Sequence, residues 1–140
     1  MIKKYLIVTL IILFFNSSLL AKSKFLQEGI NLYNKKKFDD AKFKFEQDIV
    51  LNPKSELSYL YLSKIFKNLN KIKLEELNLN TVILLNPRNE EAIYNLAKLK
   101  LNVSDYKKST KLNNKLFSLC KKFCNQSRAL KIEIKNLSKK

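Results

Sequence analysis

The chain has 140 residues, which is a single-domain length, and 46% of them are hydrophobic, which places it among folded proteins. It carries 28 Lys and Arg residues against 12 Asp and Glu residues, for a formal net charge of +16. With no histidine and a single glycine, it cannot form histidine-based triads, histidine general bases, histidine-containing metal sites or the usual glycine-rich phosphate loops.

The N-terminal residues 1–21 have the layout of a secretory signal peptide. Two lysines precede an uninterrupted apolar run from Leu6 to Phe15, and a short polar stretch then leads to Ala21, the expected last residue removed. The apolar run is only about half as long as the roughly 20 residues of a membrane-spanning helix. We therefore expect an exported, periplasmic protein. An uncleaved inner-membrane anchor is the alternative, because residues 19–21 could extend the apolar span.

The rest of the sequence repeats with a period of 34 residues. The stretches IVLNPKS and ILLNPRN place Pro53 and Pro87 one period apart, and the blocks 22–55, 56–89 and 90–123 follow one another without insertion. Gly29, Ser63 and Ala97 share the eighth position of these blocks, where a small side chain lets two helices pack closely. Because prolines fall only in the connections, the period predicts six helices. Their expected ranges are 22–35, 39–52, 56–69, 73–86, 90–103 and 106–119.

From residue 22 onward the chain resembles the tetratricopeptide-repeat family. The stretch GINLYNKKKFDDAKFKFEQDIVLNP has Gly29, Phe38, Ala41, Phe45 and Pro53 at the intervals typical of that family. The resemblance implies an all-α fold, a right-handed α-solenoid of three helix pairs, each of which needs a neighbour to bury its apolar face. The segment 124–140 is expected to form the capping helix that ends the array.

The sequence departs from the family pattern at two kinds of position. In the second helices, small residues of the family pattern are replaced by Glu75 in block two, and by Asp48 and Leu116 at a later position of blocks one and three. We therefore expect less regular packing in these blocks. The glycine expected at the turn inside each pair is replaced by Lys36, Asn70 and Ser104. Of these three residues, only asparagine readily adopts a left-handed conformation.

The two cysteines of the chain, Cys120 and Cys124, lie where the next repeat boundary falls. They are separated by three residues rather than the two of thioredoxin-like redox sites, and two thiolates without histidine cannot supply the four ligands of a structural zinc. In an exported protein the favoured interpretation is a structural disulfide, which requires the segment to depart from a straight helix. Inert thiols and thiol redox activity are the alternatives.

The resemblance also implies a concave groove, lined by the first helix of each pair, that binds peptide segments or helices of other proteins. Carried over position by position, the expected groove residues are Leu26, Ile30, Tyr33, Leu57, Leu60, Lys64, Lys67, Tyr94, Lys98 and Leu101, together with Asn34, Asn68 and Asn102. The three asparagines lie one period apart and could hydrogen-bond an extended peptide, with helix-end capping as the alternative. The lysines favour an apolar partner segment that carries some acidic residues.

These observations predict an exported protein-protein interaction module or scaffold rather than an enzyme. We expect no cofactor, no metal and no nucleic acid, a protein partner, and membrane contact only through the N-terminal segment if it is not cleaved. The alternative is a membrane-anchored or polyanion-surface-binding basic protein that uses its lysines, and such binding would depend strongly on salt.

Overall fold

A computed structural model describes residues 23–138, and the predicted signal peptide lies outside this range. The described residues form seven helices and no strand: α2 (Lys24–Asn34), α3 (Phe38–Leu51), α4 (Glu56–Asn68), α5 (Ile72–Leu85), α6 (Glu90–Asn102), α7 (Tyr106–Leu119) and α8 (Cys124–Leu137). The predicted ranges of the first six differ from these bounds by no more than about two residues at either end.

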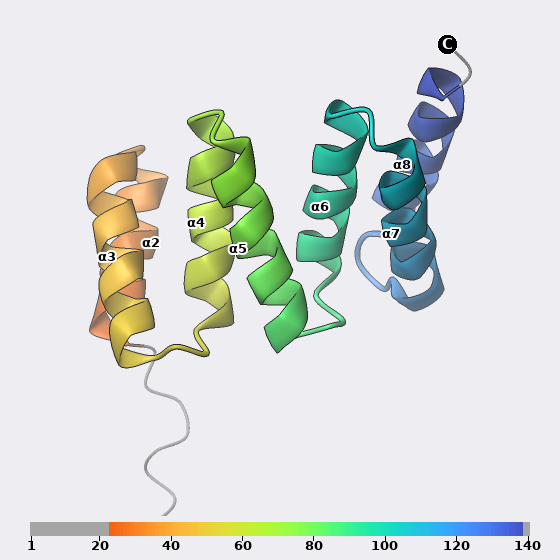
Figure 1. Cartoon of the computed structure of the whole chain (residues 1–140). Helices are drawn as coiled ribbons and strands as arrows, with labels where there is room; N and C mark the ends of the chain where they lie inside the picture. The colour runs from red at the N-terminus through yellow and green to blue at the C-terminus, as the bar shows by residue number, and fades with distance from the viewer. Residues whose placement is uncertain (1–22, 139–140) are drawn as a thin grey trace, which may run out of the picture.

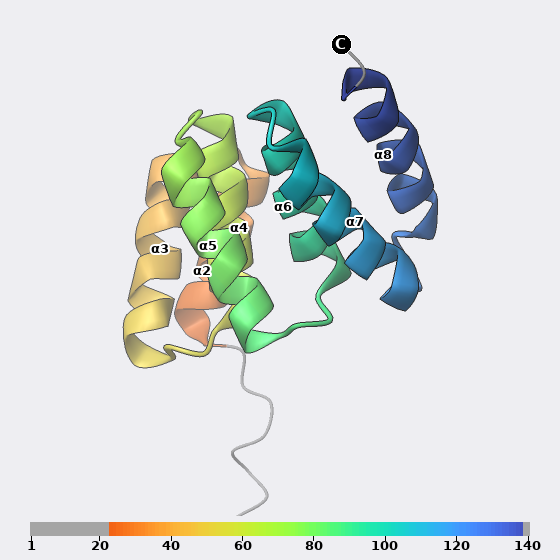
Figure 2. The same cartoon turned by 45° about the vertical axis from the view of Figure 1, so that its right-hand side comes forward.

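The helices pack as successive antiparallel pairs. α2 packs on α3, α4 on α5 and α6 on α7, and each pair packs against the next through α3 with α4 and α5 with α6. Figure 1 shows this row of helices, and Figure 2 shows α8 at its C-terminal end. α8 packs against α7 and also reaches α6, so it covers the last pair.

Three apolar clusters hold the pairs together. The first joins Phe45 of α3 to Ile65 of α4, and the second joins Leu79 of α5 to Leu96 of α6. The third packs Leu130 of α8 against residues of α6. Each cluster takes residues from two neighbouring units, so no helix pair in residues 23–138 buries its apolar face alone. This is the mode of stability expected of a repeat array.

The small residues of the 34-residue period lie where helices approach most closely. Gly29, Ser63 and Ala97 are all buried. At Gly29, a Cβ atom would stand 2.7 Å and 2.8 Å from two carbons of the Phe45 ring. Because the ring occupies the space of a side chain, packing favours glycine here, in agreement with the small residue that the sequence predicted at this position.

The turn inside each pair is left-handed at every repeat. The φ angles are 59° at Lys36, 53° at Asn70 and 61° at Ser104. The amide of the residue after each turn donates back into the preceding helix; Lys37, for example, donates to the carbonyl of Leu32 at 3.0 Å. This bonding satisfies carbonyls that a helix end leaves open. Lysine and serine therefore adopt the conformation that the family pattern assigns to glycine.

The connections between pairs are held by carboxylates. Asp48 of α3 is fully buried and accepts hydrogen bonds from the hydroxyls of Ser23, Ser55 and Ser58. It thereby ties the start of α2 to the connection between α3 and α4. The departure from a small residue at this position, which the sequence linked to irregular packing, instead builds a polar junction in which the buried carboxylate is hydrogen-bonded.

Glu56 does the same at the next connection. The side chain of Asn86 donates to both carboxylate oxygens of Glu56 at 3.1 Å, and the side chain of Asn89 donates to one of them. Glu56 is the first residue of α4, whereas the two asparagines lie after α5. The carboxylate therefore links the beginning of a helix pair to the connection that leaves it.

Candidate partner-binding groove

Two adjoining cavities open along α4, α5 and α6. One, of about 240 Å³, is lined in part by Tyr33 and Lys64, and the other, of about 400 Å³, by Lys98 and Asn102. Lys67, Asn68, Glu75 and Asn95 line both. We call the two cavities together the groove. Six of the predicted residues lie in it: Tyr33, Lys64, Lys67, Asn68, Lys98 and Asn102.

The predicted asparagines end the first helix of each pair. Asn34, Asn68 and Asn102 are the last residues of α2, α4 and α6, and all three are exposed. Within residues 23–138 their side chains form no hydrogen bond, and the helix ends are closed by backbone amides instead. Their amide groups are therefore not used for capping, and those of Asn68 and Asn102 face the groove with both donor and acceptor unengaged.

The lysines of the groove differ in how they are paired. Lys64 Nζ lies 2.7 Å from a carboxylate oxygen of Glu91, and Lys98 Nζ lies 2.8 Å from Glu133. Lys67 is exposed and makes no ion pair among the described residues. Because two of the three cations already bind a carboxylate, the groove does not have the strong positive charge expected from its lysines alone.

Glu75 supplies a further negative charge. Only 6% of the residue is exposed, and it forms neither a hydrogen bond nor an ion pair within residues 23–138. Burial raises the pKa of Glu75, and the ammonium of Lys67 offsets that rise only in part. A side chain of this kind favours a hydrogen-bond donor or a cation as its neighbour.

The overall architecture is shared with several solved structures, all at low sequence identity. With the TPR domain of OM64 from Arabidopsis, the TM-score is 0.71 at 16% identity, over 80% of this chain and 92% of that one. With the TPR2B domain of yeast Sti1, solved in a complex with pHsp70, the TM-score is 0.74 at 14% identity, over 82% of this chain and 99% of that one. The chain has the tetratricopeptide-repeat fold.

A bacterial example of this TPR fold is equally similar. With the type III secretion chaperone SycD of Yersinia enterocolitica, solved in complex with a peptide of the translocator YopD, the TM-score is 0.73 at 15% identity, over 84% of this chain and 93% of that one. No protein-family model and no curated protein matches the sequence. The predicted all-α helical repeat is confirmed at the level of the fold.

Three predicted groove residues belong to the core of the TPR array instead. Leu26, Leu60 and Leu101 are 6%, 3% and 3% exposed, and each is part of one of the apolar clusters between helices. Their side chains pack within and between the pairs and leave little surface exposed, although Leu60 also lines the cavity that contains Leu57. Their burial follows from the contacts that each of the first helices makes with its neighbours, and their part in partner binding stays a prediction.

The remaining predicted apolar residues do not line the groove. Ile30 packs against the first cluster, and Tyr94 packs against the third and against the ring of Phe123 at a centroid distance of 5.6 Å. Leu57 lines a separate cavity beside Phe123 and Glu90. The predicted apolar floor is therefore not found within the groove itself, whose lining is mostly polar.

Sequence reasoning missed the roles of Glu75, Glu91 and Asn95. Glu75 gave a usable signal, because a charged residue stands there in place of the small residue that close helix packing favours. The equivalent residues of the other repeats, Ala41 and Ser109, are small and fully buried. Asn95 gave no signal, since it occurs in an asparagine-rich chain and none of the other repeats has an asparagine at that position.

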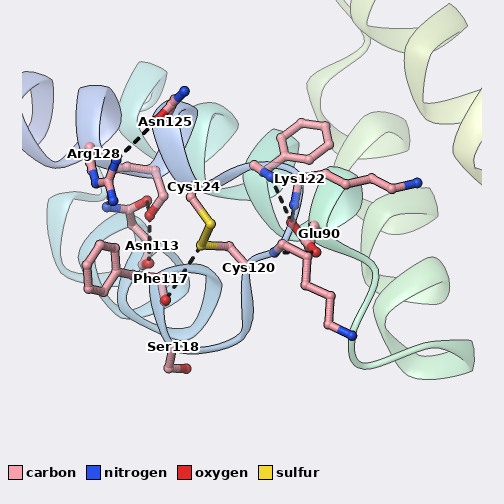
Figure 3. The surroundings of a disulfide bond; sticks show 12 residues. Glu90, Asn113, Phe117, Ser118, Cys120, Lys122, Cys124, Asn125 and Arg128 are labelled. Carbon is pink, nitrogen blue, oxygen red and sulfur yellow. Dashed lines mark hydrogen bonds between the residues drawn. A yellow bond between two sulfur atoms is a disulfide. The ribbon is translucent and has the colours of Figure 1, made fainter.

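The predicted cysteine pair lies at the junction of the last repeat and α8 (Figure 3). Cys120 follows α7, Cys124 begins α8, and their Sγ atoms form a disulfide across Cα atoms 5.3 Å apart. Residues 120–123 are not helical, so the segment leaves the straight helix that would have kept the cysteines apart. This bond agrees with the favoured interpretation of a disulfide and not with the alternative of two inert thiols.

Glu90 holds the same junction from the other side. Its carboxylate accepts backbone hydrogen bonds from Lys121, Lys122 and Phe123 at 2.8, 2.9 and 2.8 Å. These amides, Phe123 first, hold the pKa of Glu90 below its ordinary value, because they stabilise the ionised form. The turn that starts the capping helix is thus fixed both covalently and by a carboxylate.

Among the described helices, none is both long and apolar enough to cross a membrane.

Proposed function

We propose that the chain is an exported, periplasmic interaction module that binds a peptide or helical segment of a partner protein in the groove. The observation that carries this proposal is the row of unengaged polar groups along α4 and α6. Asn68, Asn95 and Asn102 line adjoining cavities, and none of their side chains is hydrogen-bonded within residues 23–138. Amides in this state can pair with the donors and acceptors of a bound peptide backbone.

Two of the similar structures support binding as the activity. The Sti1 TPR2B domain was solved in a complex with pHsp70, and SycD with a peptide of YopD. A fold does not determine a ligand, so these partners are not transferred to this chain. We propose only that the shared fold is used here in the same general manner, as a binding surface rather than a catalyst.

The N-terminal sequence and the disulfide support export. Residues 1–21 have the signal layout, and disulfides persist mainly in oxidising compartments such as the periplasm. Cell fractionation with mass measurement tests this proposal. We expect a periplasmic chain that begins at Lys22 and is lighter by two hydrogens than its reduced form. A membrane-bound chain that retains residues 1–21 would favour the alternative of a basic protein anchored at a membrane surface.

The groove is tested with peptides selected from a random display library on the purified chain. The selected peptides are measured by fluorescence anisotropy against Asn68→Ala/Asn102→Ala and against Asn80→Ala as a matched control. Asn80 is an exposed asparagine of α5 outside the groove. Loss of two hydrogen bonds of about 1 kcal/mol each weakens binding about 30-fold. Equal binding by the double variant and the control would place the peptide elsewhere.

A further inference from the structure

Glu75 is the carboxylate of the groove whose charge has no partner among residues 23–138. Glu91, the other carboxylate there, pairs with Lys64 at 2.7 Å. Glu75 lines both cavities, yet it is 6% exposed and receives no hydrogen bond from the described residues. The equivalent Ser109 in the third repeat donates its hydroxyl to a backbone carbonyl and is satisfied. The carboxylate oxygens of Glu75 therefore open into the groove, and no described residue donates to them.

The surroundings of Glu75 offer amide groups, but no cation that is paired with it. The oxygens of the Asn68 and Asn95 amides can accept further N–H groups beside the carboxylate. Lys67 is the nearby cation, but its side chain is exposed and makes no ion pair with Glu75 in the described range. A carboxylate that is largely buried and has no ion pair is less well solvated than a free one, and an incoming cation that binds it recovers part of that free energy.

We propose that Glu75 anchors a subsite of the groove that receives a basic side chain, arginine in particular, from the bound partner segment. This inference rests on the proposed function and names the chemistry of its ligand. A guanidinium fits because its planar fork of donors binds a carboxylate through two hydrogen bonds and leaves other donors for neighbouring amides. The adjoining cavity of about 240 Å³ is large enough for such a side chain.

A subsite for arginine requires a positive charge on the partner segment, whereas the lysines alone suggest a negative one. Lys64 and Lys98 are each bound to a carboxylate and are not available for acidic residues of a ligand. Lys67 remains, and its charge competes with an incoming guanidinium for Glu75. Removal of the Lys67 charge and removal of the Glu75 charge are therefore expected to change arginine binding in opposite directions.

The test uses the same display library on the full chain and on Glu75→Gln. We expect arginine at one fixed position among peptides selected by the wild type and no such preference with the variant. One selected peptide is then compared with its citrulline counterpart, which keeps the shape of arginine without the charge. The wild type is expected to bind the arginine peptide about tenfold more tightly than the citrulline peptide, whereas Glu75→Gln should bind both equally. Lys67→Gln should increase the ratio of the two affinities. Thermal unfolding verifies that both variants fold.

The outcomes separate this inference from the proposed function. If peptides bind and Asn68→Ala/Asn102→Ala weakens them, but arginine and citrulline peptides bind equally, the groove stands and the basic subsite is wrong. A preference for acidic peptides that Lys67→Gln abolishes would also overturn it. If no selected peptide depends on the groove asparagines, the proposed function fails and the subsite fails with it.

Discussion

The contact between Gly29 and Phe45 makes a sharp prediction about stability. Alanine favours a helix interior over glycine by about 1 kcal/mol, so Gly29→Ala would stabilise α2 if space allowed. The added methyl would instead lie 2.7 and 2.8 Å from ring carbons of Phe45. That ring is fully buried and stacks on Tyr61 at 5.0 Å and 12°, so it cannot move aside easily. Overpacking of this kind costs about 1–3 kcal/mol.

The two effects oppose each other, and the collision is the larger. We expect Gly29→Ala to lower the free energy of unfolding by about 1 kcal/mol, or the melting temperature by about 4 °C for a domain of this size. Urea denaturation followed by circular dichroism measures the first quantity and a thermal scan the second. Ser63→Ala, at the equivalent position of the second repeat, is the matched control and should be close to neutral, because its hydroxyl bonds only within its own helix.

A double variant tests the cause. Phe45→Val removes the Cδ1, Cε1 and Cζ carbons that the methyl would meet, so Gly29→Ala made in that background should stabilise the protein by up to about 1 kcal/mol relative to Phe45→Val alone. The reasoning is refuted if Gly29→Ala stabilises the wild type, or if its effect is the same with and without the Phe45 ring.

Three further predictions concern the turns and the C-terminal junction. Lys36→Gly and Ser104→Gly should each raise the free energy of unfolding by about 0.5–1 kcal/mol in urea titrations, because these residues hold positive φ; a loss of stability would contradict this. Replacing Cys120 and Cys124 by serine should lower the free energy of unfolding by about 2 kcal/mol, which is the loop entropy of a five-residue ring. An unchanged denaturation midpoint would show that the disulfide contributes nothing to stability. The lowered pKa of Glu90 stabilises the fold at pH values above the unfolded-state pKa, and this stability is lost as the pH falls through the folded-state pKa. Glu90→Gln should therefore lose less stability on acidification than the wild type. Parallel plots of unfolding free energy against pH for the two proteins would contradict this role.

The period predicted those parts of the structure that each repeat builds in the same way. The small residue at Gly29, Ser63 and Ala97 and the turns inside the pairs recur because each helix pair has the same local geometry. A spacing of 34 residues is enough to find them, since the relevant contacts lie within one unit. The disulfide was predictable for a related reason: its two residues are close in sequence, and only the local path of the chain had to be inferred.

The chemistry of the groove could not be obtained in this way. Lys64 pairs with Glu91 and Lys98 with Glu133, each across two different units of the array, and no repeat pattern relates these partners. Their pairing changes the net charge that a ligand would encounter. The burial of Leu60 likewise depends on α5 and α6 packing beside it, which the pattern of α4 alone does not reveal.

The carboxylates at the start of α4 and α6 affect what happens when a repeat is duplicated. Glu56 and Glu90 each reach the connection that follows their own helix pair, so each of these units closes its exit with its own first residue. A tandem duplication of residues 56–89 would therefore carry its own contact of Glu56 with Asn86 and Asn89, and the one new joint would again place a glutamate directly after Asn89. A duplicated repeat would thus bring all the residues of its own polar junction, even though it cannot bury its apolar faces without a neighbour.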